Sequence, residues 1–275
     1  QMCIRDSDKG ANWTHINNAI PSNSGITAIG TDPNNDNRLL FYNSAGLFLS
    51  ADGGASFSRL NNYTYGEINR MLIQSSGRFV VASTSGIYYS DNAGSSWTLA
   101  TGTASSNNSL WDLVQKPNDP TTLYAVASQA TSNALLLYTS TNSGNSFTSK
   151  TVTYNSSTLT CTGARLAVSV ANNTYVYCVT LQSSGYPAVL RSTNSGSTWS
   201  VTAVSTTQSF GGDNTSTGLG MSSGQGYYDL DIAVSPLNVN QVIVGTTSTY
   251  RSADGGFNFS PIGGYLGTFG HKIHP

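Results

Sequence analysis

An octet with the pattern Ser-x-Asp/Asn-x-Gly-x-Ser/Thr-aromatic recurs along this chain and limits its possible folds more than any other feature. Six copies, two of them with small departures, occupy residues 6–13, 50–57, 90–97, 140–147, 192–199 and 252–259. We call this octet the box. The terminal aromatic residues of successive boxes fall 40 to 60 residues apart. A repeat of this length is typical of four-stranded propeller blades rather than of a helical solenoid.

Each residue type of the box suits a tight hairpin. The Asp or Asn at the third position can accept hydrogen bonds from N–H groups of its own turn, and the glycine can adopt a positive φ. The aromatic residue begins the next strand and packs inward, so we expect the Trp97 and Trp199 rings to be buried between neighbouring blades. We therefore assign a structural role, and no catalytic one, to the third-position residues Asp8, Asp52, Asn92, Asn142, Asn194 and Asp254.

The segments between the boxes also repeat. Residues 26–60 contain a strand, a Pro-Asn-Asn turn, a second strand, a turn with Gly, a third strand, the box and a fourth strand. The same order recurs in residues 68–100, 110–150, 164–204 and 228–262. Turn residues every 8 to 12 positions, with no long apolar stripe of helical period, indicate an all-β protein. The sequence predicts a β-propeller of four-stranded antiparallel blades with box hairpins.

The ends of the chain set the expected domain organisation. We expect residues 8–275 to form a partial propeller of five complete blades plus flanking strands, in a ring of seven or eight blades. The residues after 262 are too few for the three strands that would complete a blade with residues 12–16. Residues 1–7 resemble an artefactual leader of genes assembled from environmental DNA, and we set them apart from fold reasoning.

Composition excludes several classes of function. The net charge is -1 and 9% of the residues are charged, which does not fit nucleic-acid binding. No apolar run approaches the roughly 18 residues of a membrane helix, so we expect no membrane insertion. A hairpin of 164–170 with 175–181 would place Cys178 near Ala167 and Cys161 near Ser184. That register disfavours a direct cross-strand disulfide, although pairing of the two cysteines stays open.

The boxes and their spacing resemble the BNR or Asp-box repeat family, which includes sialidases, xyloglucan-cleaving glycoside hydrolases and sortilin-type receptor domains. This resemblance covers nearly all of residues 8–262. It implies that the box joins the third and fourth strands of a blade, remote from any active site. The stretch "GQGYYDLDIAVSPLNVN" at 224–240 resembles blade openings in large secreted bacterial proteins of this kind. The resemblance implies a secreted or cell-surface location within a larger multidomain chain.

In a propeller, the residues just before each first strand surround the central channel, and we call these the lead-in segments. They carry most candidate site residues: Glu67, Trp111, Asp112, Arg165, Tyr227, Tyr228 and Asp229. Aromatic rings can stack on sugars, and two carboxylates such as Glu67 and Asp229 could act as general acid and base if roughly 5 to 9.5 Å apart. The alternative, which we favour over catalysis, is that the rings fill the channel while Asp112 and Asp231 accept backbone hydrogen bonds.

The candidates for enzymatic function are weak ones. Sialidases hold the substrate with an arginine triad, whereas only Arg70 and Arg165 lie in lead-in segments, and Arg59 belongs to a fourth strand. The Asp-Ile-Gly-Gly signature of the xyloglucanases is absent. His271 and His274 suffice for no complete metal site, and we expect no metal and no cofactor. The sequence therefore favours a module that binds a glycan or protein ligand, with a glycoside hydrolase as the alternative.

Overall fold

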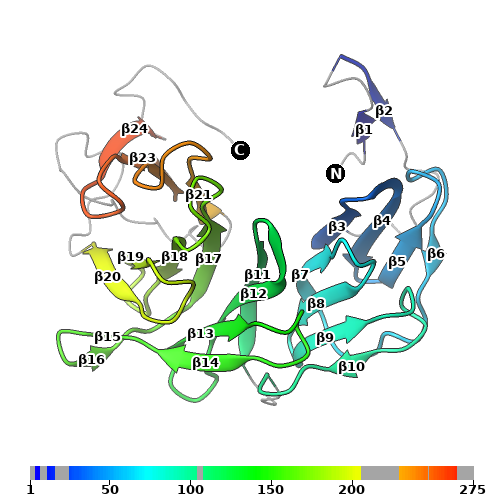
Figure 1. The fold of residues 1–275 in the computed structure, drawn as a ribbon, viewed down its shortest axis with the longest axis horizontal. Coiled ribbons are helices and arrows are strands. Elements are labelled where there is room, and N and C mark those ends of the chain that lie inside the picture. The colour runs from blue at the N-terminus through cyan, green and yellow to red at the C-terminus, as the bar shows by residue number, and fades with distance from the viewer. Residues whose placement is uncertain are drawn as a thin grey trace. The chain divides into compact units, whose positions relative to one another are not determined.

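The computed structural model describes residues 4–6, 11–15, 25–103, 108–205, 229–246 and 248–264. Within these ranges the strands form five four-stranded antiparallel sheets and two hairpins (Figure 1). This part of the chain contains no helix that could cross a membrane. The predicted all-β architecture of four-stranded sheets is confirmed, and we call the five sheets blades I to V.

The chain divides into two compact units, and the first, residues 1–106, holds blades I and II. Blade I comprises β3 (Ala28–Asp32), β4 (Asn35–Asn43), β5 (Gly46–Ser50) and β6 (Ser58–Arg59). Blade II comprises β7 (Ile68–Ile73), β8 (Phe79–Ser83), β9 (Gly86–Ser90) and β10 (Thr98–Leu99). In both blades the strands are hydrogen-bonded in chain order.

The second unit, residues 107–275, holds blades III to V. Blade III comprises β11 (Ser109–Lys116), β12 (Asp119–Ser128), β13 (Leu135–Ser140) and β14 (Thr148–Thr151). Blade IV comprises β17 (Gly163–Val168), β18 (Val176–Leu181), β19 (Pro187–Ser192) and β20 (Ser200–Val204). Blade V comprises β21 (Asp231–Val234), β22 (Val242–Gly245), β23 (Ser248–Ser252) and β24 (Ser260–Gly264). A hairpin of β15 (Thr153–Tyr154) and β16 (Ser157–Thr158) lies in the connection between blades III and IV.

A two-stranded sheet precedes blade I. It pairs β1 (Ile4–Asp6) with β2 (Trp13–His15) in the register Ile4↔His15, so residues of the segment that we set apart as a leader take part in the fold. These two strands flank the first box, as third and fourth strands do in a blade. The third-position residue of that box, Asp8, lies outside the described residues.

The core forms where blades of one unit pack face to face. Side chains of a strand alternate between its two faces, so a strand between two other blades must be apolar on both. In β18, Cys178 packs toward blade III while Tyr177 and Val179 pack toward blade V. All six residues of β18 are buried for this reason.

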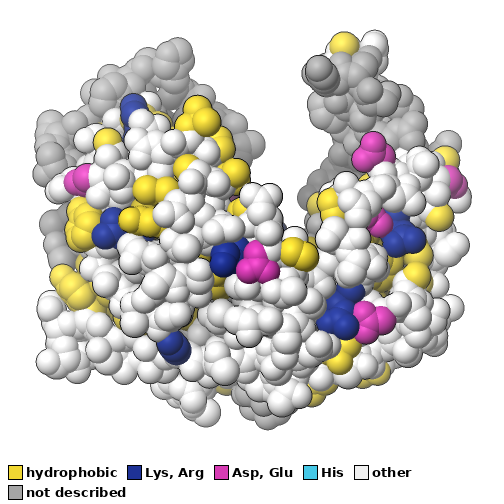
Figure 2. All heavy atoms as spheres, in the orientation of Figure 1, with side chains coloured by type: hydrophobic (Ala, Val, Ile, Leu, Met, Phe, Trp, Pro, Cys, Tyr) yellow, Lys and Arg dark blue, Asp and Glu magenta, His cyan; other side chains and the backbone are white. Residues whose placement is uncertain are grey.

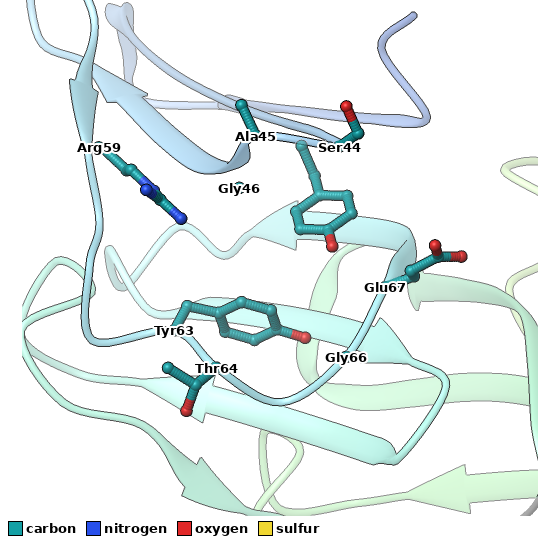
Figure 3. Close-up of a pocket in the computed structure, with 9 residues that line it drawn as sticks. Ser44, Ala45, Gly46, Arg59, Tyr63, Thr64, Gly66 and Glu67 are labelled. Atoms are coloured by element: carbon teal, nitrogen blue, oxygen red, sulfur yellow. The ribbon is translucent and has the colours of Figure 1, made fainter. Parts of the chain in front are cut away.

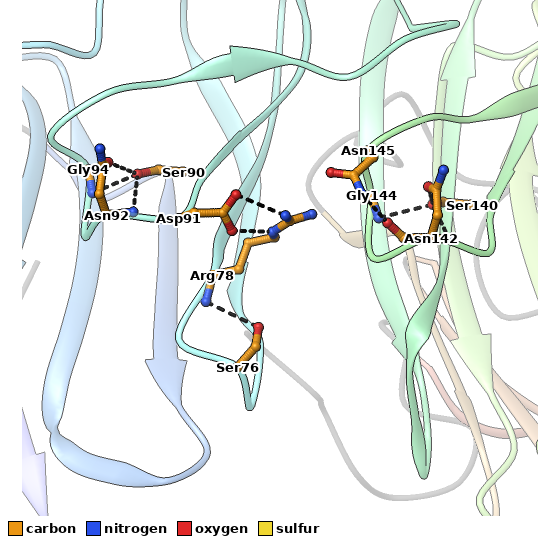
Figure 4. A network of polar contacts seen from close by, with 10 residues as sticks. All are labelled: Ser76, Arg78, Ser90, Asp91, Asn92, Gly94, Ser140, Asn142, Gly144 and Asn145. Carbon is orange, nitrogen blue, oxygen red and sulfur yellow. Dashed lines mark hydrogen bonds and ion pairs between the residues drawn. The ribbon is translucent and has the colours of Figure 1, made fainter.

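Every described box joins the third and fourth strands of its blade, as predicted, and holds itself together by one hydrogen-bond pattern (Figure 4). In the box at 90–97, the Ser90 hydroxyl accepts a bond from the Gly94 N–H (2.8 Å) and donates to Asn92 Oδ1 (2.9 Å). The same Asn92 oxygen accepts from the Ser96 N–H at 2.9 Å. The first-position serines, which the sequence analysis did not single out, are buried in all five boxes: Ser50, Ser90, Ser140, Ser192 and Ser252.

The box can contain either Asp or Asn at its third position, because the hydroxyl at the seventh position changes between donating and accepting a hydrogen bond. Where the third residue is Asn92, its side-chain N–H donates to the Ser96 hydroxyl at 2.8 Å. Where it is Asp52, the direction reverses and the Ser56 hydroxyl donates to Oδ2 at 2.5 Å. A hydroxyl both donates and accepts, so Ser or Thr at position seven fits both residues.

The box aromatic residues differ in burial. Trp97 is 9% exposed and packs edge-on against the Tyr63 ring, with the ring centroids 5.2 Å apart. Phe147 and Phe259 are also buried. Trp199 is only partly buried, so the expectation that it lies fully between two blades is wrong.

We expect Trp97→Ala to lower the free energy of unfolding by about 3 to 5 kcal/mol, because it removes a buried ring from the packing between blades I and II. Trp199→Ala should cost less, because part of that ring is already in water. Denaturation by urea, followed by far-UV circular dichroism, measures both values. Equal losses in the two variants would contradict the burial difference.

The Asp52 box makes stability depend on pH. Hydrogen bonds from the Ser56 hydroxyl and N–H stabilise the carboxylate and lower the pKa of Asp52 from 3.8 to about 2. A lowered pKa stabilises the fold above the unfolded value, and this stabilisation is lost as the pH falls from about 4 toward 2. Asp52→Asn should remove that part of the acid dependence while keeping the box intact, since Asn occupies the same position in three other boxes. Acid unfolding of wild type and variant tests this, and identical pH profiles would refute it.

Candidate functional site

A pocket of about 260 Å³ opens at one end of blades I and II (Figure 3). The turn between β4 and β5 forms one wall, with Ser44, Ala45 and Gly46. The lead-in segment of β7, which includes Tyr63, Thr64, Gly66 and Glu67, forms another wall, and Tyr42 and Arg59 complete the lining. The predicted site residue Glu67 therefore lines a pocket.

The location of this pocket follows from strand direction. Antiparallel strands alternate in direction, so the turn between the first two strands and the box lie at one end of a blade. The turn between the second and third strands and the lead-in segment lie at the other end. The pocket thus opens at the end opposite the boxes of blades I and II, as the sequence analysis expected for a ligand site.

Aromatic rings stiffen the inner side of the pocket. Tyr63 packs edge-on against Tyr42, with ring centroids 6.3 Å apart, and edge-on against Tyr65 at 5.7 Å. Tyr65 in turn stacks on Tyr88 at 4.3 Å. Burial raises the pKa of the Tyr63 phenol well above its usual value, so this group is protonated at any physiological pH.

Two charged side chains line the pocket without a polar partner among the described residues. The side chains of Arg59 and Glu67 are exposed, and within the described residues neither makes a hydrogen bond or ion pair. The backbone of Glu67 is fixed, because its N–H donates to the Thr84 hydroxyl at 3.2 Å and its carbonyl accepts from the Thr84 N–H at 2.9 Å. Arg59 was not predicted as a site residue, since a fourth-strand position gives no signal that its side chain reaches a lead-in segment.

The second unit brings together three other predicted site residues. Arg165 Nη1 donates to the Trp111 carbonyl at 3.2 Å, and Trp111 Nε1 donates to the Ser128 hydroxyl at 3.1 Å. Asp112 is 5% exposed, and its two oxygens accept from the N–H groups of Leu113 (2.9 Å) and Leu166 (2.8 Å). Since Leu166 belongs to β17, the Asp112 carboxylate links the first strands of blades III and IV.

These contacts agree with the interpretation of Asp112 and Asp231 as acceptors of backbone hydrogen bonds. Asp231 Oδ1 accepts from the Ile232 N–H at 2.9 Å, as Asp112 does from its own neighbour. Arg165, between them in chain order, occupies the matching register position on β17. Three adjacent first strands therefore carry Asp, Arg and Asp at one equivalent position, a pattern that strand pairing exposes and sequence spacing conceals.

The remaining candidates are placed as follows. Asp229 directly precedes the buried Leu230, just as Glu67 directly precedes the buried Ile68. Tyr227, Tyr228, His271 and His274 lie outside the described residues. In the described ranges, no group of three or more His, Cys, Asp or Glu side chains could hold a metal ion.

Cys161 and Cys178 are buried free thiols in the core between blades III and IV, and Cys3 lies outside the described residues. The predicted hairpin of β17 and β18 is confirmed, and Cys178 lies opposite Leu166, one residue from the expected Ala167. Burial raises the pKa of Cys161 from 9.0 to about 11 and raises the pKa of Cys178 well above its ordinary value.

Both thiols should therefore resist an exposed-thiol reagent such as dithionitrobenzoate until the fold opens, because the thiolate is the reactive form. A raised pKa stabilises the fold below the unfolded value, so this contribution is lost as the pH rises from about 9 toward 11. Thiol titration across this range, with and without denaturant, measures the effect. Rapid labelling of Cys161 or Cys178 at pH 8 in the folded protein would contradict it.

Comparison with solved structures identifies the fold. A GH74 enzyme of Niastella koreensis is 21% identical with a TM-score of 0.60, covering 87% of this chain and 38% of its own. The GH74 xyloglucanase of Xanthomonas campestris is 15% identical with a TM-score of 0.61, covering 85% and 37%. YCF48 of Cyanidioschyzon merolae is 15% identical with a TM-score of 0.61, covering 94% and 77%.

These likenesses show that the fold is a β-propeller, and at such low identity they show nothing beyond the fold. The chain spans less than two fifths of the length of the two GH74 enzymes. No family model matches the sequence, and no curated protein matches it either.

Proposed function

We propose that this chain is a ligand-binding β-propeller of the Asp-box family that recognises a glycan or protein ligand without turning it over. The five self-bonded box hairpins and their place in each blade support the family assignment. We further propose that it is secreted or displayed on a cell surface as part of a larger chain. Figure 2 shows only scattered Lys, Arg, Asp and Glu side chains on the visible face, in keeping with a chain of which 9% of the residues are charged.

The pocket between blades I and II is the observation that carries the binding function. It combines tyrosine side chains with one exposed carboxylate, Glu67, and one exposed guanidinium, Arg59. Pockets that bind small groups in this way place a few polar groups on an aromatic background. The fixed backbone of Glu67 and the packed ring of Tyr63 pre-form this pocket, which reduces the entropy lost on binding.

Binding without hydrolysis is favoured because this lining holds a single carboxylate. Most glycosidases need two carboxyl groups, roughly 5 to 9.5 Å apart, on either side of the scissile bond. Glu67 is the one acidic residue among those that line the pocket. Asp112, a second candidate for a catalytic carboxylate, is buried, and both of its oxygens accept hydrogen bonds from backbone N–H groups.

A glycoside hydrolase is the second candidate function, and its support is the fold-level likeness to GH74 enzymes. In that case Glu67 or Asp229 would act as one carboxylate of the pair. Trp111, Arg165, Tyr227 and Tyr228 would then bind sugars near Asp229. The internal partners of Trp111 and Arg165 favour a structural role for these two residues instead.

Glycan and peptide arrays, combined with an assay for sugar release, distinguish the two functions. We expect binding without release, weakened by Glu67→Gln and unchanged in Asp52→Asn, which alters only a box at the opposite end of its blade. Binding lost in a folded Asp52→Asn variant would place the function on the boxes. Sugar release that Glu67→Gln or Asp229→Asn abolishes would establish the hydrolase.

A further inference from the structure

Ion pairs engage several charged side chains of the first unit, so an arginine that faces a pocket without a polar partner among the described residues is informative. Arg38 pairs with Asp32 at 3.2 Å, and Arg78 pairs with Asp91 at 2.6 Å. Arg59, by contrast, has no polar partner within the described residues although it faces a pocket. Glu67 likewise has no partner for its carboxylate, and the two charges do not pair with each other.

The fold does not require an arginine at position 59. Arg59 lies opposite the third residue of β5, and Leu99 of blade II lies opposite the third residue of β9. Leu99 packs over Gly86 in blade II just as Arg59 lies over Gly46 in blade I. The same place in the blade is thus filled by an apolar side chain in one case and by a cation in the other, so the charge has no structural task that Leu could not perform.

Gly46 and Gly66 leave the space in the pocket wall that Arg59 and the segment carrying Glu67 occupy. Gly46 has a φ of 129°, and a Cβ atom there would lie 2.9 Å from Arg59 Nε. Gly66 has a φ of 90° and lies directly before Glu67. A Cβ atom at Gly66 would collide with the Thr84 hydroxyl. Bulkier residues at these positions would displace Arg59 or the strand opening that holds Glu67.

Figure 3 shows Arg59 and Glu67 on opposite sides of the pocket, with the Tyr63 ring below the space between them. The charge of Glu67 also reaches the Tyr42 phenol, whose pKa is raised by burial first and by Glu67 second. The pocket therefore presents a cation at one side, an anion at the other and tyrosine between them. Its volume of about 260 Å³ lies just below the range of pockets for drug-sized ligands.

We propose that this pocket binds a small zwitterion with its charges at opposite ends, the class that free dipeptides represent. Arg59 binds the ligand carboxylate through its planar guanidinium, a geometry suited to two parallel hydrogen bonds. Glu67 binds the ligand ammonium group, and the tyrosines contact the apolar part between the charges. The inference concerns the same pocket as the proposed function but does not depend on glycan or protein binding.

Isothermal titration calorimetry with the full chain and four forms of one dipeptide tests the proposal. The probes are alanylphenylalanine, its C-terminal amide, its N-acetyl derivative and the form with both ends blocked. We expect the free dipeptide to bind most tightly. Blocking either end should weaken binding roughly ten- to hundred-fold, the size expected for a lost hydrogen bond to a charged group.

Two variants assign each charge to its partner. Arg59→Leu, which copies the residue of blade II, should bind the free dipeptide and its amide equally. Glu67→Gln should bind the free dipeptide and its N-acetyl derivative equally. Arg78→Gln is the matched control, since it removes an arginine of the same unit that pairs with Asp91 beside a box, and it should bind like wild type.

Several results would overturn the proposal. The first is that the blocked dipeptide binds as tightly as the free one, and the second is that neither variant changes the preference for free ends. Absence of any dipeptide binding at millimolar concentration would also refute it. None of these results bears on the arrays, so a chain that binds a glycan or a protein but no dipeptide would retain its proposed function and lose this inference.

Discussion

The hydrogen bonds of the buried serine hydroxyl that opens each of the five described boxes are the interactions on which the rest of the structure depends. This hydroxyl accepts the N–H of the box glycine at 2.8 to 3.0 Å and donates to the Asp or Asn at position three. These bonds close the turn between the third and fourth strands without help from another blade. A hairpin that satisfies its own polar groups can be repeated with varied strands, because each blade then needs only apolar faces to pack on its neighbours. The box glycine adds to this packing, since a Cβ atom at Gly196 would lie 2.8 Å from the Thr139 hydroxyl of blade III.

Strand direction separates stability from recognition within each blade. The boxes and the first turns lie at one end, where hydrogen bonds and the Arg78–Asp91 ion pair are satisfied locally. The opposite end is built from lead-in segments and second turns. Blade I carries Gly46 with Arg59 at that end, and blade II carries Gly86 with Leu99 at the equivalent place. One exchange at an exposed position therefore converts a filled corner into the wall of a polar pocket, and the boxes remain unchanged.

Charged residues are few in this chain, and the contacts of several of them show a clear structural role. Asp112 is buried, and it is tolerated there because two backbone N–H groups satisfy its oxygens and link β11 to β17. Asp32 is buried and pairs with Arg38. Glu67 and Arg59 are the contrary case, because they are exposed, lie at one pocket and have no polar partner within the described residues. Ligand binding accounts for such a pair more directly than stability does, since exposed charges contribute little to folding.

The repeat, the all-β class, the four-stranded blades and the place of each box could be predicted from the amino-acid sequence alone, because these depend on local turn chemistry and on the period of apolar residues. The sequence also predicted a ligand site at the blade end that the lead-in segments form, with Glu67 among its residues. It did not indicate Arg59 or Tyr42, which reach the same pocket from a fourth and a second strand. It did not distinguish Trp97 from Trp199, whose boxes are alike while their neighbours in the preceding blade differ. These points became visible only in three dimensions, because they depend on contacts between side chains of strands that are far apart in the chain. A local sequence pattern contains no information about such contacts.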